Sequence, residues 1–243
     1  VKTYKMKKLL LILLCFPLLT LAQQTYVPND NFEAYLEANG MGDGIANNDS
    51  VTTSNINTIT SLNIISQTIS DLTGIVDFTS LTTLYCYSNQ LTSLDVSNNT
   101  ALTTLWCYSN QLTNLDVSQN LALTELNCGN NQLTSLDVSQ NTALTYLGCF
   151  TNQLTNLDVS QNTALTTLSC GNNQLTNLDV SNNTALTDLR CKPNQLTSLD
   201  VSQNTALTTL YCGSNQLTSL DLSNNTALTT LWCYSIQLTS LDV

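Results

Sequence analysis

Hydrophobic positions recur along this chain with a period of 21 residues, from Leu81 to Val243. The first copy, residues 81–101, reads LTTLYCYSNQLTSLDVSNNTA and divides into two similar halves. Each half has a leucine, a second leucine three residues later and an apolar residue two further on. The last two alternate with polar residues, as in a strand that buries one face. The copies begin at Leu81, Leu102, Leu123, Leu144, Leu165, Leu186, Leu207 and Leu228, and the eighth is cut short at Val243.

A fixed period of this length predicts a repeat solenoid, in which each copy forms one coil. No copy can bury its leucines alone, so stacking of the coils must supply the core. The pattern predicts parallel β-strands, with the strand of each half paired to its equivalent in the next coil. Residues 51–80 are predicted to form a degenerate additional coil, and nine coils would span about 40 Å. The inward positions of that coil are Leu62, Ile64, Ile69, Leu72 and Ile75.

Residues 23–50 differ from the repeats and are predicted to form a short helical N-terminal cap that closes the core. Asn29 or Asp30 can begin the helix. Helical spacing gives it an apolar face of Phe32, Tyr35 and Leu36, with Glu33 and Glu37 on the other side.

The segment from Asp43 to Asp49 has oxygen-bearing side chains, as a calcium loop would. It lacks the alternating spacing and the final glutamate of an EF-hand, so an ordinary polar turn is favoured.

Residues 1–22 are predicted to be a secretory signal peptide. Lys7 and Lys8 precede an apolar run, and Thr20-Leu21-Ala22 provides a cleavage site of the small-residue type. A membrane anchor is the alternative, but the apolar run is short and is followed by polar residues. The mature protein is therefore expected to be secreted or at the cell surface, without a transmembrane helix.

The charge distribution excludes some classes of partner. Four of the six basic residues lie in the first eight positions, so residues 23–243 contain 2 basic and 17 acidic residues, a net charge of −15. Such a surface repels phosphate backbones, which argues against nucleic acid binding. Histidine, the commonest general base and metal ligand, is absent. No cofactor and no metal ion are predicted.

One cysteine recurs in every copy, at a core position. Equivalent residues of stacked parallel strands have Cβ vectors that run side by side, which does not suit disulfide formation. A straight column cannot supply tetrahedral zinc ligands either. We therefore predict a ladder of buried free thiols, formed by Cys86, Cys107, Cys128, Cys149, Cys170, Cys191, Cys212 and Cys233.

Polar residues form further columns. Asparagines equivalent to Asn89 and Asn99 are expected to bond to backbone groups that the turns leave unpaired. Aspartates equivalent to Asp95 lie between inward residues and therefore face solvent. They are expected to bond to nearby Ser, Thr or backbone groups; the alternative is that Ca²⁺ bridges neighbouring carboxylates.

The motif LxxLxCxxNxL, as in residues 81–91, resembles a leucine-rich repeat whose third leucine has become cysteine. The 21-residue period with LDVSxNT in its second half is similar to the internalin J type of bacterial surface protein. Residues 51–80 resemble an ordinary leucine-rich repeat, and residues 26–50 resemble the helical cap of internalin-like proteins. The resemblance implies an extracellular adhesion or ligand-binding role.

The copies differ mainly at three positions around the cysteine, which are 83, 85 and 87 in the first copy. All aromatic residues of the eight copies occur there. Aromatic residues also favour strands for packing reasons, but the second half of each copy carries none. Exposed aromatic and basic residues mark interaction surfaces, so we predict a ligand-binding face, on the concave side, for a protein or a glycan. Its residues are Tyr85, Tyr87, Trp106, Tyr108, Tyr146, Phe150, Arg190, Lys192, Tyr211, Trp232 and Tyr234.

Two other function classes remain open on the sequence. Columns of threonine equivalent to Thr82 and Thr92 could bind ice or a mineral surface. A carbohydrate-active solenoid enzyme would need an acid/base pair unlike the repeat background, and the one such patch is Asp188-Arg190-Lys192. That patch is better explained as tuning the charge of the binding face, so no enzymatic activity is predicted.

Overall fold

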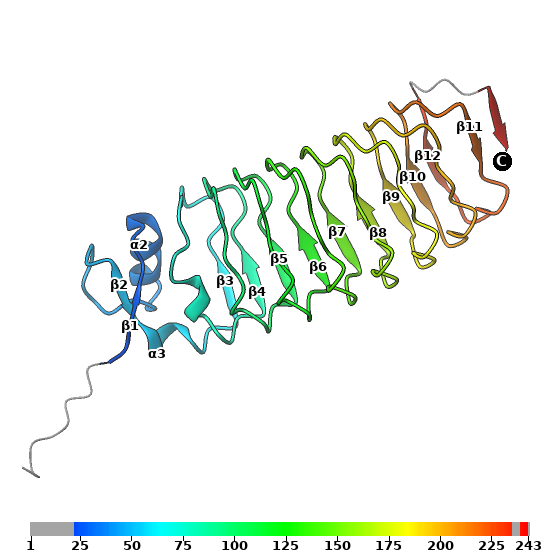
Figure 1. The fold of residues 1–243 in the computed structure, drawn as a ribbon. Helices are drawn as coiled ribbons and strands as arrows, with labels where there is room; N and C mark the ends of the chain where they lie inside the picture. Colours follow the sequence, from blue (N-terminus) through cyan, green and yellow to red (C-terminus); the bar gives the residue numbers. More distant parts are fainter. Residues whose placement is uncertain (1–21, 235–238, 243) are drawn as a thin grey trace, which may run out of the picture.

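A parallel nine-stranded sheet forms one wall of the solenoid in the computed structural model (Figure 1). The structure describes residues 22–234 and 239–242, so the predicted signal peptide lies almost wholly outside the described residues. Adjacent strands pair each residue with its equivalent in the next coil, as Leu84 with Leu105. In spatial order the strands are β3 (Ser61–Asn63), β4 (Thr83–Tyr85), β5 (Thr104–Trp106), β6 (Glu125–Asn127), β7 (Tyr146–Gly148), β8 (Thr167–Ser169), β9 (Asp188–Arg190), β10 (Thr209–Tyr211) and β12 (Thr230–Trp232).

The core is a continuous column of leucine, cysteine and valine that runs through the coils. Leu81, Leu84, Cys86, Leu91 and Val96 of the first copy are fully buried, and their equivalents repeat this pattern through the seventh copy with small variations. The five inward positions predicted for residues 51–80 are also buried. The prediction of a stacked leucine-rich solenoid is therefore confirmed.

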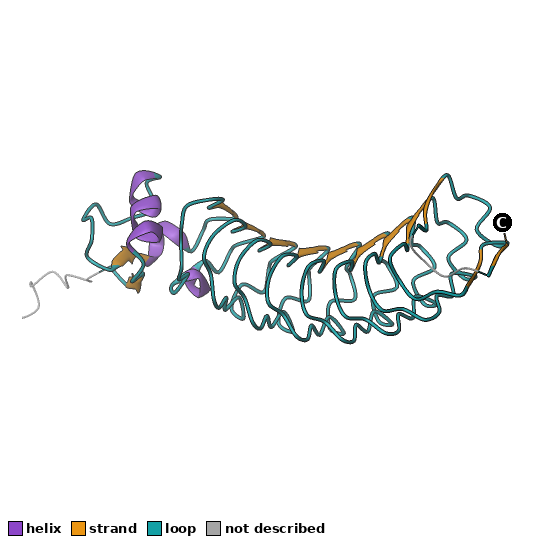
Figure 2. Cartoon of the chain, turned by 90° about the horizontal axis from the view of Figure 1, so that it is seen from above, coloured by secondary structure: helices purple, strands orange, loops and turns teal. Residues whose placement is uncertain are grey.

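The prediction of a second ladder of strands, in the second half of each copy, is largely wrong. Among the described residues only β11 (Ser219–Asp221) and β13 (Ser240–Asp242) pair there. Figure 2 shows the reason: the solenoid is curved, with the nine-stranded sheet on its concave side. Coils that are about 4.8 Å apart at the sheet must diverge toward the convex side, where backbone groups no longer reach each other.

The N-terminal segment packs onto the first coil. β1 (Gln24–Tyr26) is antiparallel to β2 (Ser50–Thr52), and α2 (Asp30–Ala38) and α3 (Thr53–Ile56) complete the segment. The 3-10 turn η2 (Ile75–Asp77) belongs to the first coil. The Oδ1 atom of Asn29 accepts a hydrogen bond from the Phe32 N–H at 3.0 Å, so Asn29 caps α2 as predicted. The ring of Phe32 stacks on Phe78 with centroids 6.3 Å apart, which joins α2 to the solenoid core. None of the helices in the described part of the chain is long and apolar enough to cross a membrane.

Glu33 is buried in the structure, which corrects the prediction that it lies on the polar side of α2. Its side chain is only 1% exposed, and its carboxylate accepts hydrogen bonds from the backbone N–H groups of Asn48 and Asp49. Glu37 similarly accepts from the N–H groups of Asp43 and Gly44. In this loop the backbone donors point at the carboxylates, which is the arrangement of a polar turn rather than that of a calcium loop.

Two ladders of asparagine bind the coils together. Asn131 shows the first type: its Nδ2 donates to the carbonyls of Cys107 and Cys128, and its Oδ1 accepts from the Leu112 N–H. Asn120 shows the second type: its Nδ2 donates to the carbonyls of Val96 and Asn99. Both ladders therefore satisfy backbone groups at the turns, as predicted.

The described cysteines are free, and those from Cys86 to Cys212 are buried while Cys233 is partly exposed. The prediction of a free-thiol ladder is confirmed. Burial raises the pKa of Cys86, Cys128 and Cys212 to about 12, so these thiols stay protonated at neutral pH.

Because the thiolate is the reactive form, the buried cysteines are expected to resist alkylation in the folded protein. Brief treatment with iodoacetamide at pH 8, followed by peptide mass spectrometry, should label Cys233 first and leave the seven buried residues unmodified. In 8 M urea all eight should react. Rapid native labelling of Cys149 or Cys170, which lie in the middle of the ladder, would contradict the described packing.

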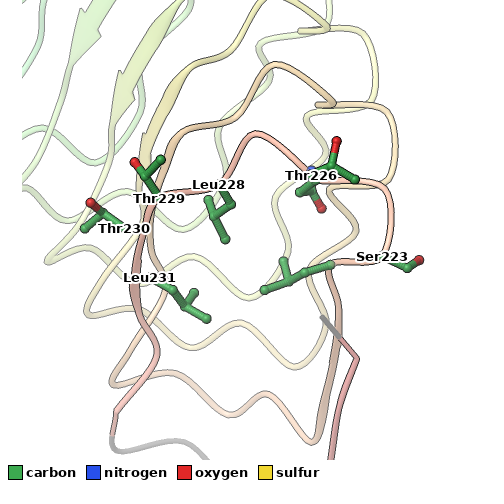
Figure 3. A pocket seen from close by; sticks show the side chains of 8 residues that line it. Ser223, Thr226, Leu228, Thr229, Thr230 and Leu231 are labelled. Atoms are coloured by element: carbon green, nitrogen blue, oxygen red, sulfur yellow. The ribbon is translucent and has the colours of Figure 1, made fainter.

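A cavity of about 360 Å³ lies at the C-terminal coils, lined partly by Leu222, Leu228 and Leu231. Figure 3 shows Leu228 and Leu231 directed toward the interior of the coil. Their equivalents one coil earlier, Leu207 and Leu210, are fully buried. The cavity is therefore a continuation of the leucine core, and its lining carries no charged group.

Candidate ligand-binding face

The sheet on the concave side presents the positions at which the copies differ. In β4 the central residue, Leu84, is buried, whereas Thr83 and Tyr85 are half-buried on the opposite side of the sheet. The residue after the cysteine, Tyr87 in this coil, lies just beyond the strand. We call these three positions in all coils the concave face (Figure 2). All eleven predicted site residues lie there, and they form two clusters and two separate positions.

The N-terminal aromatic cluster comprises Tyr85, Tyr87, Trp106 and Tyr108, from two adjacent coils. Tyr87 and Tyr108 stack with ring centroids 4.2 Å apart and an interplanar angle of 12°. Tyr85 packs against Trp106 at 5.1 Å. Lost hydration, together with a hydrogen bond to Tyr87, raises the pKa of Tyr108, so the phenol remains neutral at physiological pH. The cluster is an uncharged platform of rings.

The C-terminal aromatic cluster comprises Tyr211, Trp232 and Tyr234, with Arg190 and Lys192 beside them. Tyr211 and Trp232 stack with centroids 4.9 Å apart and an interplanar angle of 15°. The Cζ atom of Arg190 lies 5.1 Å from the Tyr211 ring centroid. The Nζ atom of Lys192 lies 4.1 Å from the centroid of Trp232. Cations this close to ring faces are attracted to them electrostatically, so this cluster is basic as well as aromatic.

Tyr146 and Phe150 belong to neither cluster, because glycines of the repeat accommodate their rings. A Cβ atom on Gly129 would stand 2.6 Å from the Phe150 ring, and one on Gly148 would stand 3.1 Å from the Tyr146 hydroxyl oxygen. Both aromatic side chains are therefore packed along the sheet.

The prediction that the variable positions are exposed is only partly right. Asn127, Gly129, Gly148, Gly171 and Gly213 are buried, because neighbouring side chains or backbone cover them. Sequence reasoning missed the role of these glycines. The signal was present for Gly129, Gly171 and Gly213, since the adjacent copies carry large residues at the same position.

The patch considered for catalysis is occupied by an ion pair. The Asp188 carboxylate accepts hydrogen bonds from Nε and Nη2 of Arg190, the latter at 2.8 Å. This pairing raises the pKa of Arg190 further above its ordinary range. A carboxylate held by a guanidinium is a poor general acid or base, so the geometry favours a charge-setting role for Asp188.

The threonine column equivalent to Thr82 also has a structural role. From Thr103 to Thr229, one Oγ1 per coil donates to the carbonyl of the equivalent threonine in the preceding coil, for example Thr103 to Thr82 at 3.1 Å. These bonds favour a structural role for this column over ice binding, which would need hydroxyl hydrogens free to meet water.

The aspartate column lies outside the concave face and bonds to its own turn. The Oδ1 atom of Asp137 accepts from the Ser139 N–H at 2.9 Å, and bonds from that serine lower the pKa of the aspartate. The prediction of local bonding is therefore confirmed. No group of three acidic, cysteine or histidine side chains in the described ranges could hold a metal ion. The same bond to the serine two residues later occurs in Asp95, Asp116, Asp158, Asp179, Asp200 and Asp221.

Comparison with known proteins agrees with this architecture. A family model for leucine-rich repeats, in two copies, matches residues 79–120. The functional domain of internalin J (InlJ) from Listeria monocytogenes, described as including a cysteine ladder, is 42% identical with a TM-score of 0.72. That alignment covers 93% of this chain and 55% of the InlJ chain, so the chain spans about half of that relative.

Two further structures extend the comparison. A leucine-rich repeat protein from Leptospira interrogans is 30% identical with a TM-score of 0.65, covering 68% of this chain and 46% of its own. Internalin C2 from Listeria monocytogenes shares the fold, with a TM-score of 0.75, 24% identity, and coverage of 91% and 98%. No curated protein sequence matches.

The chain is therefore a leucine-rich repeat protein. Within that class it is of the internalin J-like type, with which it shares the cysteine ladder.

Proposed function

We propose that this leucine-rich repeat protein is a secreted or cell-surface binding module that holds a protein or glycan ligand on its concave face. The main observation for this proposal is that aromatic and basic residues gather in two clusters on that face, whereas the rest of the repeat is nearly invariant. Tyr, Trp and Arg are the residues that most often anchor interfaces. The similarity to internalins and the predicted signal peptide support an extracellular location.

Replacing Trp106, Tyr108 and Trp232 together with alanine is expected to abolish ligand binding. Loss of one central aromatic anchor typically weakens an interface by about 30-fold, so loss from both clusters should leave no measurable complex. The measurement is binding of the full chain to an array of extracellular proteins and oligosaccharides. Circular dichroism and a thermal melt should show that the solenoid remains folded.

The matched control changes three exposed asparagines of the second half of the repeat, Asn114, Asn156 and Asn177, to alanine. This control should bind like the unmodified protein. If the aromatic triple variant retains the same array targets, or if the asparagine control loses them, the ligand does not bind on the concave face.

A further inference from the structure

Arg190 and Lys192 are the only basic residues after residue 8 in the whole sequence, and both lie beside the C-terminal aromatic cluster. Asp188 neutralises Arg190 through the ion pair at 2.8 Å. No carboxylate lies within 4.0 Å of the Lys192 ammonium in the described ranges. The one carboxylate and two cations leave a local charge of +1 on a protein whose residues 23–243 carry −15.

The Lys192 side chain is held in place by aromatic rings. Its Nζ atom lies 4.1 Å from the centroid of Trp232, 4.7 Å from that of Tyr234 and 5.0 Å from that of Tyr211. It also lies 3.2 Å from the Tyr234 hydroxyl, two coils away. The intervening coil has Gly213 at the equivalent position, so no side chain stands between them. One of the three ammonium N–H groups is thus used, and two remain to donate to a ligand.

The rings around this ammonium stand in register on adjacent coils, with Tyr211 of β10 paired to Trp232 of β12. In the last coil of the sheet that the structure describes, Trp232 is 48% exposed and Tyr234 is 56% exposed. An open ring face can stack against the C–H face of a sugar. An ammonium with free donors, fixed beside that ring, can pair with a carboxylate on the same sugar.

We propose that the C-terminal aromatic cluster is a subsite for a saccharide that carries a carboxylate. Lys192 pairs with the carboxylate, and Trp232 and Tyr234 stack on the sugar ring. This proposal rests on the proposed function of the concave face. The −15 charge of residues 23–243 repels a polyanion, such as an acidic protein surface or a polysulfated chain. A single carboxylate on an otherwise neutral, hydroxyl-rich molecule meets the local positive charge with little of that repulsion.

The test compares lactose with its sialylated form, which adds one carboxylated sugar, by titration calorimetry on the full chain. The sialylated form is expected to bind at least about tenfold more tightly, the effect of one charge-assisted hydrogen bond. Lys192→Met keeps the aliphatic packing and should remove this preference, whereas Lys192→Arg should retain most of it. Asp188→Asn should strengthen binding of the sialylated form, because it frees Arg190. Asn114→Ala, which changes an exposed residue outside the concave face, should leave the preference unchanged.

Three results would overturn the subsite. They are equal affinities for the two sugars, unchanged or tighter binding by Lys192→Met, and selective binding of an acidic peptide in place of the sugar. The opposite signs expected for Lys192→Met and Asp188→Asn separate charge recognition from a structural role of Lys192. If Lys192→Met has no effect while the aromatic triple variant still loses its array targets, the subsite is wrong and the binding face stands. If neither has any effect, both proposals are wrong.

Discussion

Alanine in place of Asn131 is expected to lower the free energy of unfolding by about 1–3 kcal/mol. Asn131 is only 9% exposed, and its side chain bonds four backbone groups, of Leu112, Cys107, Cys128 and Gly129. Alanine leaves the Leu112 N–H without its partner where water has little access, and an unsatisfied buried group costs about 1–3 kcal/mol. The carbonyls of Cys107 and Cys128 each keep one asparagine of a neighbouring coil, Asn110 and Asn152. The measurement is urea denaturation followed by circular dichroism.

Asn114→Ala is the matched control, because Asn114 is exposed and lies two residues from Leu112. It should change the free energy of unfolding by less than about 0.5 kcal/mol. Hydrogen exchange adds a local readout: the Leu112 amide should exchange faster in Asn131→Ala and at its normal rate in Asn114→Ala. Equal stabilities of the two variants would show that the asparagine ladder does not hold the coils together.

The stacking that this ladder supports could be predicted from the sequence alone, because every coil must repeat the same contacts. Leucine spacing identifies the buried positions, and the recurrence of Asn89 and Asn99 identifies the turns. What failed was the second strand, since curvature is a property of the whole stack and no single copy encodes it. The prediction for Glu33 failed for a related reason. Its hydrogen-bond donors, the N–H groups of Asn48 and Asp49, come from a loop whose path helical spacing does not reveal.

The candidate site was predicted as a set of positions but not as an arrangement. Comparing the copies identified every aromatic residue of the concave face. It could not show that Lys192 reaches across Gly213 to Tyr234, because that contact joins residues 42 positions apart. Nor could it separate the clustered rings from Phe150, which is packed against a glycine. Which side chains meet depends on the sizes of residues in neighbouring coils. A position-by-position comparison of the copies does not reveal these contacts.

Gly171→Ala is expected to destabilise the protein by about 1–3 kcal/mol, the usual cost of overpacking. A Cβ atom at this position would overlap the Lys192 carbonyl oxygen and stand 2.9 Å from its carbonyl carbon. These are backbone atoms of the residue between Cys191, which is buried in the core, and Pro193, so they cannot move independently of the coil. The measurement is a lower urea midpoint in denaturation followed by tryptophan fluorescence. Because the carbonyl belongs to Lys192, the preference for a carboxylated sugar should weaken as well.

Gly148→Ala makes the same substitution two coils from Lys192 and gives the matched control. Its new methyl group would meet side-chain atoms, Oδ1 of Asn127 at 3.0 Å and the Tyr146 hydroxyl at 3.1 Å. Those atoms can shift by rotation, and alanine in place of glycine also removes about 0.4–1 kcal/mol of unfolded-state entropy. Gly148→Ala should therefore be nearly neutral. If both variants are equally stable, Gly171 is not required by the backbone of Lys192. If Gly171→Ala alone loses stability and sugar preference, one glycine of the scaffold positions the cation of the binding face.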